Sequence, residues 1–218
     1  GLHKSSVSRI IATLEEAQFV ERDPATGRFR IGLGLVALSA PALVDLRLDD
    51  VVRPFLRDLA TRAGETASFN IWDGAAAVCI DQELSSNTIA YHAPLGIRRP
   101  AHCTAVGKVL LAHAAEGDVE KILSGPLPRF TPKTITSRRA LSEELAKVRQ
   151  QGYAVNGGEY GGEVGAIAAA VKGANRNVVG AISLTVPLYR FQRKRRLELK
   201  EIVVEAAQQL SRRLGAHA

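Results

Sequence analysis

The sequence of 218 residues has no methionine and only two cysteines, Cys79 and Cys103. Two cysteines cannot build the set of disulfides that staples small secreted proteins, so we expect reduced thiols and a cytoplasmic protein. No apolar run approaches the roughly 20 residues that a membrane helix needs, and no signal peptide is visible. The sequence therefore predicts neither a membrane protein nor a disulfide scaffold.

The composition favours a folded protein with an anionic partner. Apolar residues make up 46% of the chain, which is enough for a substantial core, and the formal net charge is +7. An excess of positive charge is common in proteins that bind nucleic acids, although charge alone does not prove such binding. At this length we expect either one large domain or a medium domain with a small one.

An amphipathic helix is predicted near the start of the chain. Its apolar side chains recur at the i, i+3, i+4, i+7 spacing at Val7, Ile10, Ile11, Leu14 and Ala17. This stripe should pack against helices that lie earlier in a native chain. The opposite face carries hydroxyls and cations, which can reach phosphates and base edges in a DNA groove. Ser5 or Ser6 is expected to cap the helix.

A hairpin with a polar tip is predicted directly after this helix. Residues 19–22 and 28–31 are short strand-like runs, and the turn residues between them include Pro24 and Gly27. A helix followed at once by such a hairpin is typical of the recognition helix and wing of a winged helix-turn-helix. The alternative is an ordinary surface helix and hairpin whose charges face water.

The rest of the chain predicts a linker and a larger domain. Residues 32–48 are expected to form a linker helix interrupted near Pro41, with contact to a second subunit and packing on its own domain equally open. Helices are then expected at 49–63, 105–114, 118–123, 137–151 and 190–214. Strands are expected at 66–72, 75–82, 88–92, 153–156, 164–172 and 178–187. The predicted class is α+β, with a partial winged helix-turn-helix (1–31) followed by a GAF/PAS-like antiparallel sheet domain flanked by helices (49–218).

Three motifs, in this order, resemble the IclR family of bacterial transcriptional regulators. They are residues 2–9 (LHKSSVSR) with the hairpin, residues 96–112 (GIRRPAHCTAVGKVLLA), and Gly152-Tyr153 running into residues 165–171. The resemblance implies a non-enzymatic regulator, a homodimer or dimer of dimers, whose binding to a double-stranded DNA operator is controlled by a small-molecule effector. The residues expected at the DNA are His3, Lys4, Ser5, Ser6, Ser8, Arg9, Thr13, Arg22, Arg28 and Arg30. Since the chain lacks an initiating methionine and begins at the turn of the motif, we expect the native N-terminal helices to be missing.

The resemblance also predicts an effector pocket in the sheet domain. Its expected residues are Thr88, Tyr91, Thr104, Ala105, Val106, Gly107, Asn156, Val164, Ala166, Ser183 and Thr185. Asn156 and Ala166 stand where some relatives have an acid and a cysteine, which predicts a more neutral and slightly larger pocket. An organic acid is the expected effector, with an aromatic or amphiphilic acid as plausible as a small keto acid. The alternative is a tightly packed core in which small residues allow close approach.

Other chemistry finds little support in the sequence. His92, His102 and the two cysteines lack the paired spacing of a zinc site, so we expect a buried, hydrogen-bonded His102 and no metal or cofactor. Gly107-Lys108 lacks the rest of a phosphate loop, and no dinucleotide fingerprint or hydrolase motif is present. Two alternatives stay open: an enzyme using the pocket for hydrolytic or metal-assisted chemistry, and a ligand sensor without DNA binding.

Overall fold

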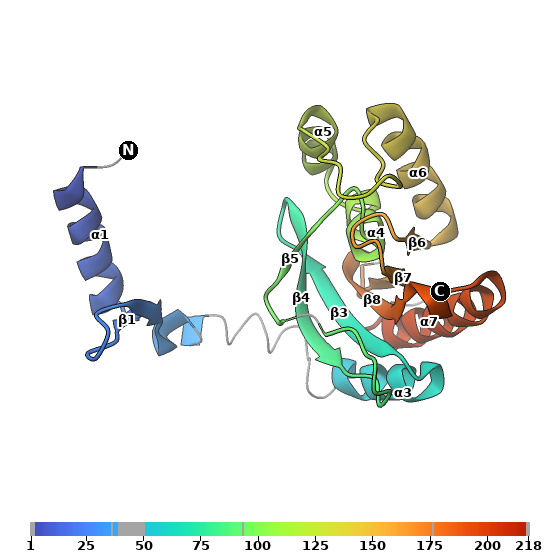
Figure 1. Cartoon of the computed structure of the whole chain (residues 1–218), viewed down its shortest axis with the longest axis horizontal. Coiled ribbons are helices and arrows are strands. Elements are labelled where there is room, and N and C mark those ends of the chain that lie inside the picture. Colours follow the sequence, from blue (N-terminus) through green and yellow to red (C-terminus); the bar gives the residue numbers. More distant parts are fainter. Residues whose placement is uncertain (1–2, 36, 39–50, 93, 176, 217–218) are drawn as a thin grey trace. The chain divides into compact units, whose positions relative to one another are not determined.

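The computed structural model of the chain describes residues 3–35, 37–38, 51–92, 94–175 and 177–216. The chain divides into two compact units, Gly1–Leu48 and Asp49–Ala218 (Figure 1). Residues 33–35 and 37–38 are helical. The remainder of the expected linker helix, including its interruption near Pro41, lies outside the described residues.

The first unit contains the expected helix and hairpin. Helix α1 (Lys4–Glu16) precedes strands β1 (Val20–Arg22) and β2 (Phe29–Ile31), which pair antiparallel. The turn between the strands is held by Asp23, whose Oδ1 accepts hydrogen bonds from the backbone N–H groups of Ala25 (2.8 Å) and Thr26 (3.2 Å). These bonds favour the ionised carboxylate and lower the pKa of Asp23.

The second unit is built on one antiparallel sheet with the strand order β5-β4-β3-β8-β7-β6. The strands are β3 (Thr66–Trp72), β4 (Ala76–Glu83), β5 (Arg98–Pro100), β6 (Tyr153–Gly157), β7 (Val164–Lys172) and β8 (Val178–Pro187). Every neighbouring pair is antiparallel, so the predicted α+β class is confirmed.

The strand expected at residues 88–92 is wrong, because these residues form no strand. Their β-branched side chains suggested pairing, but the edge beside β4 is occupied by a later segment. Gly96 N donates to Cys79 O at 2.7 Å, and Cys79 N donates to Ile97 O at 3.3 Å. These bonds lead into β5, which pairs with β4 along that edge.

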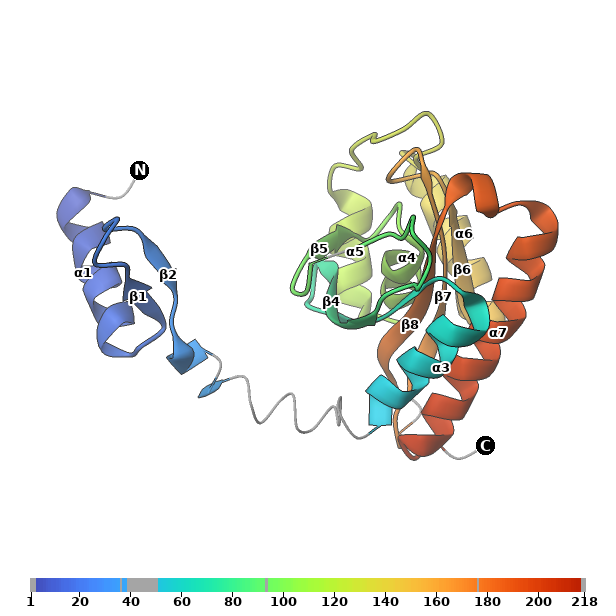
Figure 2. The same ribbon diagram turned by 60° about the horizontal axis from the view of Figure 1, so that its bottom comes forward.

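Helices cover both faces of the sheet (Figure 2). One face carries α3 (Arg53–Ala63) and α7 (Arg193–Arg213), and the other carries α4 (Ala105–Ala112), α5 (Glu116–Ser124) and α6 (Arg138–Gln151). The short 3-10 helix η2 (Leu188–Arg190) follows β8. Alternation along the strands serves both layers: Ala168 packs with the α4 side, and its neighbour Ile167 is fully buried on the other face. None of the helices in the described ranges is long and apolar enough to cross a membrane.

Candidate functional site

The polar face of α1 is accessible. Most of the residues expected at DNA are exposed, and Ser6 is half-buried. The helix cap differs from the prediction, because His3 rather than Ser5 or Ser6 is the N-cap. The His3 Nδ1 accepts from the Ser5 N–H at 3.4 Å and lies 2.8 Å from the Ser5 hydroxyl, so one serine hydroxyl is engaged locally.

The wing arginines are exposed, and two of them have partners within the unit. Arg30 forms a salt bridge to Glu21 with an Nη2–Oε2 distance of 2.9 Å, and Arg22 donates to the Gly27 carbonyl at 3.4 Å. Exposed ion pairs of this kind contribute about 0–1 kcal/mol, so a phosphate could displace them at low cost.

The apolar stripe of α1 is only partly covered by the described residues. No residue of α1 is buried, and Val7 and Ile10 are 40% and 49% exposed. The expected packing partners are helices that lie earlier in a native chain, so the burial of this stripe stays a prediction.

A cavity of about 40 Å³ lies in the second unit, on the face of the sheet that α4 covers. Its floor follows from strand register. Thr66, Thr185, Ala166 and Asn156 are successive Cα partners across β3, β8, β7 and β6. Side chains directly opposite one another point to the same face of a sheet. The start of α4 closes this floor with Thr104, Ala105 and Val106.

Nine of the expected effector residues line this cavity. They are Tyr91, Thr104, Ala105, Val106, Asn156, Val164, Ala166, Ser183 and Thr185. Thr88 and Gly107 do not line it. A Cβ at Gly107 would lie 2.6 Å from the Pro100 carbonyl oxygen and 2.7 Å from the Ala101 Cα, so this glycine serves the close approach of α4 to the preceding loop.

Arg99 lines the cavity and corrects the expectation of a more neutral pocket. Its half-buried guanidinium donates to the Tyr91 hydroxyl at 2.7 Å and lies 5.3 Å from the ring centroid. Within the described ranges, no carboxylate pairs with Arg99, whereas its neighbour Arg98 pairs with Asp73 at 2.7 Å. Adjacent residues of a strand face opposite sides, so Arg98 and Arg99 separate once β5 forms, and no strand was expected there from the sequence.

Several polar side chains face the same cavity, and one of their atoms has no hydrogen-bond partner among the described residues. The Gln82 Oε1 is buried and accepts no hydrogen bond from the described residues. The Asn156 Oδ1 is occupied, because it accepts from the backbone N–H groups of Gly158 (3.0 Å) and Glu159 (2.7 Å). The Ser68 and Ser183 hydroxyls lie 2.9 Å apart. No histidine, aspartate or glutamate from the described residues lines the cavity, so these hydroxyls have no evident general base.

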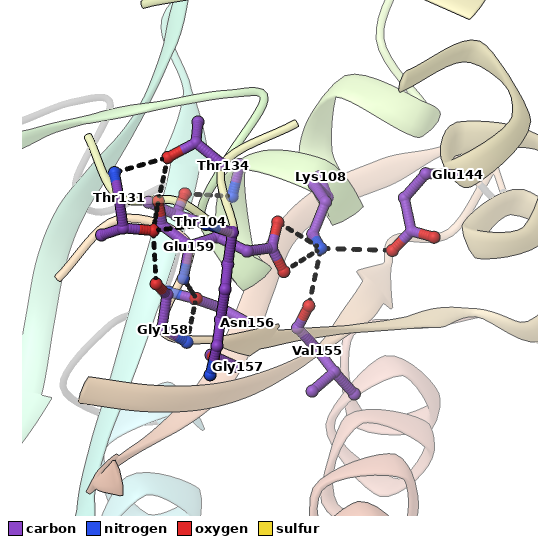
Figure 3. Close-up of polar contacts among 12 residues, drawn as sticks. Thr104, Lys108, Thr131, Thr134, Glu144, Val155, Asn156, Gly157, Gly158 and Glu159 are labelled. Atoms are coloured by element: carbon purple, nitrogen blue, oxygen red, sulfur yellow. Dashed lines mark hydrogen bonds and ion pairs between the residues drawn. The ribbon is translucent and has the colours of Figure 1, made fainter. Parts of the chain in front are cut away.

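A buried lysine on α4 contacts the backbone of β6 and two glutamates (Figure 3). Lys108 stands on α4, one turn after Thr104, and its side chain is 1% exposed. Its Nζ contacts Glu159 Oε1 at 2.9 Å, Glu144 Oε1 at 3.2 Å and the Val155 carbonyl at 2.6 Å. Because Asn156 follows Val155 directly, Lys108 links the start of α4 to the end of β6. Burial raises the pKa of Glu159, although the nearby Lys108 opposes that shift.

The cysteines and histidines form no metal centre within the described residues, where no group of three or more potential ligands gathers. Burial raises the pKa of Cys79 to about 11 and that of Cys103 to about 12, so both thiols are neutral at physiological pH. The predicted burial of His102 is confirmed: it is 4% exposed, and its Nε2 lies 3.0 Å from the Pro128 carbonyl oxygen.

The chain is similar to known proteins over most of its length. A family model described as "Bacterial transcriptional regulator IclR C-terminal" matches residues 40–212, and one for the "IclR helix-turn-helix domain" matches residues 1–24. The transcriptional repressor AllR of Escherichia coli (strain K12) is 34% identical over 98% of this chain and 79% of its own length. A crystal structure of an IclR-type regulator from Silicibacter sp. TM1040 has a TM-score of 0.92 at 28% identity, covering 100% of this chain and 86% of that one. An IclR homologue from Microbacterium hydrocarbonoxydans, complexed with 4-hydroxybenzoate, has a TM-score of 0.81 at 27% identity, covering 98% and 86%.

Proposed function

Because this chain belongs to the IclR family of bacterial transcriptional regulators, we propose that it binds operator DNA through α1 and the β1–β2 wing. A small organic acid, bound in the cavity beneath α4, controls that binding. The effector part of this proposal rests on one observation. Arg99 is a half-buried cation that faces the cavity and has no carboxylate partner among the described residues.

Exposure and charge support the DNA-binding half of the proposal. Lys4 and Arg9 are exposed on α1, and Arg22, Arg28 and Arg30 are exposed on the wing. A recognition helix in the major groove uses such side chains for bases, while the wing cations reach the flanking phosphates. We further propose that the protein acts in the cytoplasm as a homodimer or a dimer of dimers, since paired recognition helices suit symmetric half-sites.

Chemistry and size support an acid effector. Arg99 can hold a carboxylate, while Gln82 and the serine hydroxyls can hold a polar group elsewhere on the ligand. A cavity of about 40 Å³ is far below the usual volume of a ligand site. Binding therefore moves side chains apart, and this movement provides a difference between bound and free states that a linker can transmit. A relative that binds 4-hydroxybenzoate has the same fold.

The DNA-binding half predicts a loss of operator affinity when Arg9 is replaced by alanine. Removing a base contact typically costs about 1–3 kcal/mol, or roughly 5- to 150-fold in affinity. A gel-shift titration against the operator measures this loss. Arg213→Ala removes one cation from the second unit and should leave affinity unchanged. Equal operator affinity of the Arg9→Ala variant and the parent would contradict the assignment of α1.

The effector half predicts that Ser183→Leu abolishes the response to ligand. The added methyl groups would occupy the small cavity beside Ser68, while the sheet keeps its register. We expect the ligand-induced rise in melting temperature to disappear and operator binding to persist. Thr61→Leu, at an exposed position of α3, is the matched control. An undiminished thermal shift in the Ser183→Leu variant would place the effector elsewhere.

A further inference from the structure

A second cavity of about 410 Å³, which we call the edge groove, opens beside the start of β6, the strand at one edge of the sheet. Its lining residues run from the C-terminal end of α6 to that of α7. It shares no lining residue with the cavity beneath α4. Its volume lies within the range of roughly 300–1,000 Å³ that is usual for small-molecule sites.

The edge groove is lined by three cations and a histidine. The cations are Arg149, Lys172 and Arg212, and the histidine is His113. No acidic side chain of the described residues lines the groove. Lys172 and Arg212 are exposed, and neither side chain forms an ion pair within the part of the chain that the structure describes. The groove therefore has an uncompensated positive charge, which attracts anions.

Helix ends account for only some of these cations. Arg149 donates through Nε to the Ala112 carbonyl at 2.8 Å, and Arg212 lies in the last turn of α7, where cations are generally favourable. Lys172 is different, because it comes from the end of strand β7. Because Lys172 does not lie at the C-terminal end of a helix, its charge is not engaged with a helix dipole and is available to a ligand.

The pKa of His113 responds to the positive charges in the groove. Its Nδ1 lies 2.9 Å from the Val109 carbonyl oxygen, so the neutral ring donates there and leaves Nε2 free to accept. Burial lowers the pKa of His113, and the charges of Lys172 and Arg149 lower it further. An anion bound between these cations would oppose that lowering.

We propose that the edge groove binds a small phosphorylated metabolite, as a ligand site separate from the effector cavity. Lys172 and Arg212 hold the phosphate, because a dianion matches two unpaired cations. The amides of Gln151 and Gln208 can bond to hydroxyls of the ligand, and Ala207 belongs to an apolar floor beneath its body. The recessed shape and volume suit a small molecule better than a DNA backbone.

Isothermal titration calorimetry of the whole chain with glucose 6-phosphate tests the proposal, with inorganic phosphate as a second probe and glucose as the uncharged counterpart. We expect both phosphates to bind and glucose not to bind. The groove variant Lys172→Glu/Arg212→Glu should lose at least about tenfold in affinity. The control variant Lys147→Glu/Arg213→Glu has the same charge change at exposed positions outside the groove and should stay within about twofold.

A local readout separates site binding from general charge effects. Glucose 6-phosphate should raise the pKa of His113, followed by NMR, in the parent and the control variant but not in the groove variant. The single substitution Gln208→Glu adds one carboxylate at the groove and keeps Lys172 and Arg212. It should also weaken phosphate binding. Thermal melting checks that each variant is folded.

Three results would overturn the proposal. They are equal binding of glucose and glucose 6-phosphate, equal phosphate affinity of the groove and control variants, and absence of binding by both phosphates. A selective loss of affinity for short duplex DNA in the groove variant, with phosphate binding intact, would also overturn it and assign these cations to DNA. The phosphate and glucose measurements do not depend on the effector cavity or on α1.

Discussion

Replacing Lys108 with methionine is expected to lower the free energy of unfolding by about 3–5 kcal/mol, the cost of leaving a buried charge without its partner. The substitution removes the cation that contacts Glu159 and Glu144 but keeps an apolar side chain of similar length. Losing the contact to Glu159 costs more than losing the contact to Glu144, because the Glu159 side chain is only 13% exposed. Urea denaturation of the two proteins measures the difference.

The pH dependence of this loss has a definite sign. Burial already raises the pKa of Glu159, and losing Lys108 removes an interaction that lowers it. A carboxyl whose pKa is higher in the folded state binds protons more readily there, so folding becomes less favourable as pH rises through that range. The deficit of the Lys108→Met variant should therefore shrink as the pH is lowered toward the pKa of Glu159.

A double variant identifies the source of the instability. Lys108→Met/Glu159→Gln removes both buried charges and should recover part of the lost stability, with little of the pH dependence. Arg139→Met is the control, because Arg139 is 88% exposed and its pair with Glu143 contributes little. A Lys108→Met variant as stable as the parent at neutral pH would mean that the contacts in Figure 3 do not hold α4 to β6.

Replacing Arg99 with leucine is expected to reduce the affinity for an acid effector about a hundredfold, since losing one partner of a buried, hydrogen-bonded charge pair costs about 2–5 kcal/mol. The probes are 4-hydroxybenzoate, benzoate and short 2-oxo acids, and the readout is the ligand-induced rise in melting temperature. Any acid that stabilises the parent protein should fail to stabilise the Arg99→Leu variant at the same concentration.

The neighbouring arginine provides a matched control for this experiment. Arg98→Leu removes the same charge one residue earlier, where the guanidinium pairs with Asp73 outside the cavity, and should leave ligand binding intact. Tyr91→Phe removes the hydroxyl that receives the Arg99 hydrogen bond but leaves the cation, so its effect should be small. Equal thermal shifts in the Arg98→Leu and Arg99→Leu variants would show that Arg99 does not hold the acid.

Local patterns predicted most of the elements. Runs of small and β-branched residues predicted β7 and β8 with the bounds that the structure has, and a glycine marked the ends of α3 and α6, where Gly64 and Gly152 adopt positive φ. These signals are local, since they depend on neighbouring residues in the chain. The failure at residues 88–92 depends on non-local pairing, because a later segment, β5, occupies the edge beside β4.

The character of the cavity could not be read from single positions. Asn156 and Ala166 suggested a neutral pocket, but Arg99 brings a cation to it from a segment where neither a helix nor a strand was expected. Gly107 was expected beside the ligand and instead lets α4 approach the backbone near Pro100. Both outcomes depend on which face of a strand or helix meets a distant element.

The sequence by itself determined the α+β class, most helices and strands, and the family, because periodicity, caps and motifs are properties of short stretches. Only the tertiary structure decided which residues share a cavity, that Lys108 links α4 to β6, and that three cations meet at the edge groove. These features join segments separated by tens of residues. Strand register and helix packing, which bring such segments together, are set by the whole core and by no single motif.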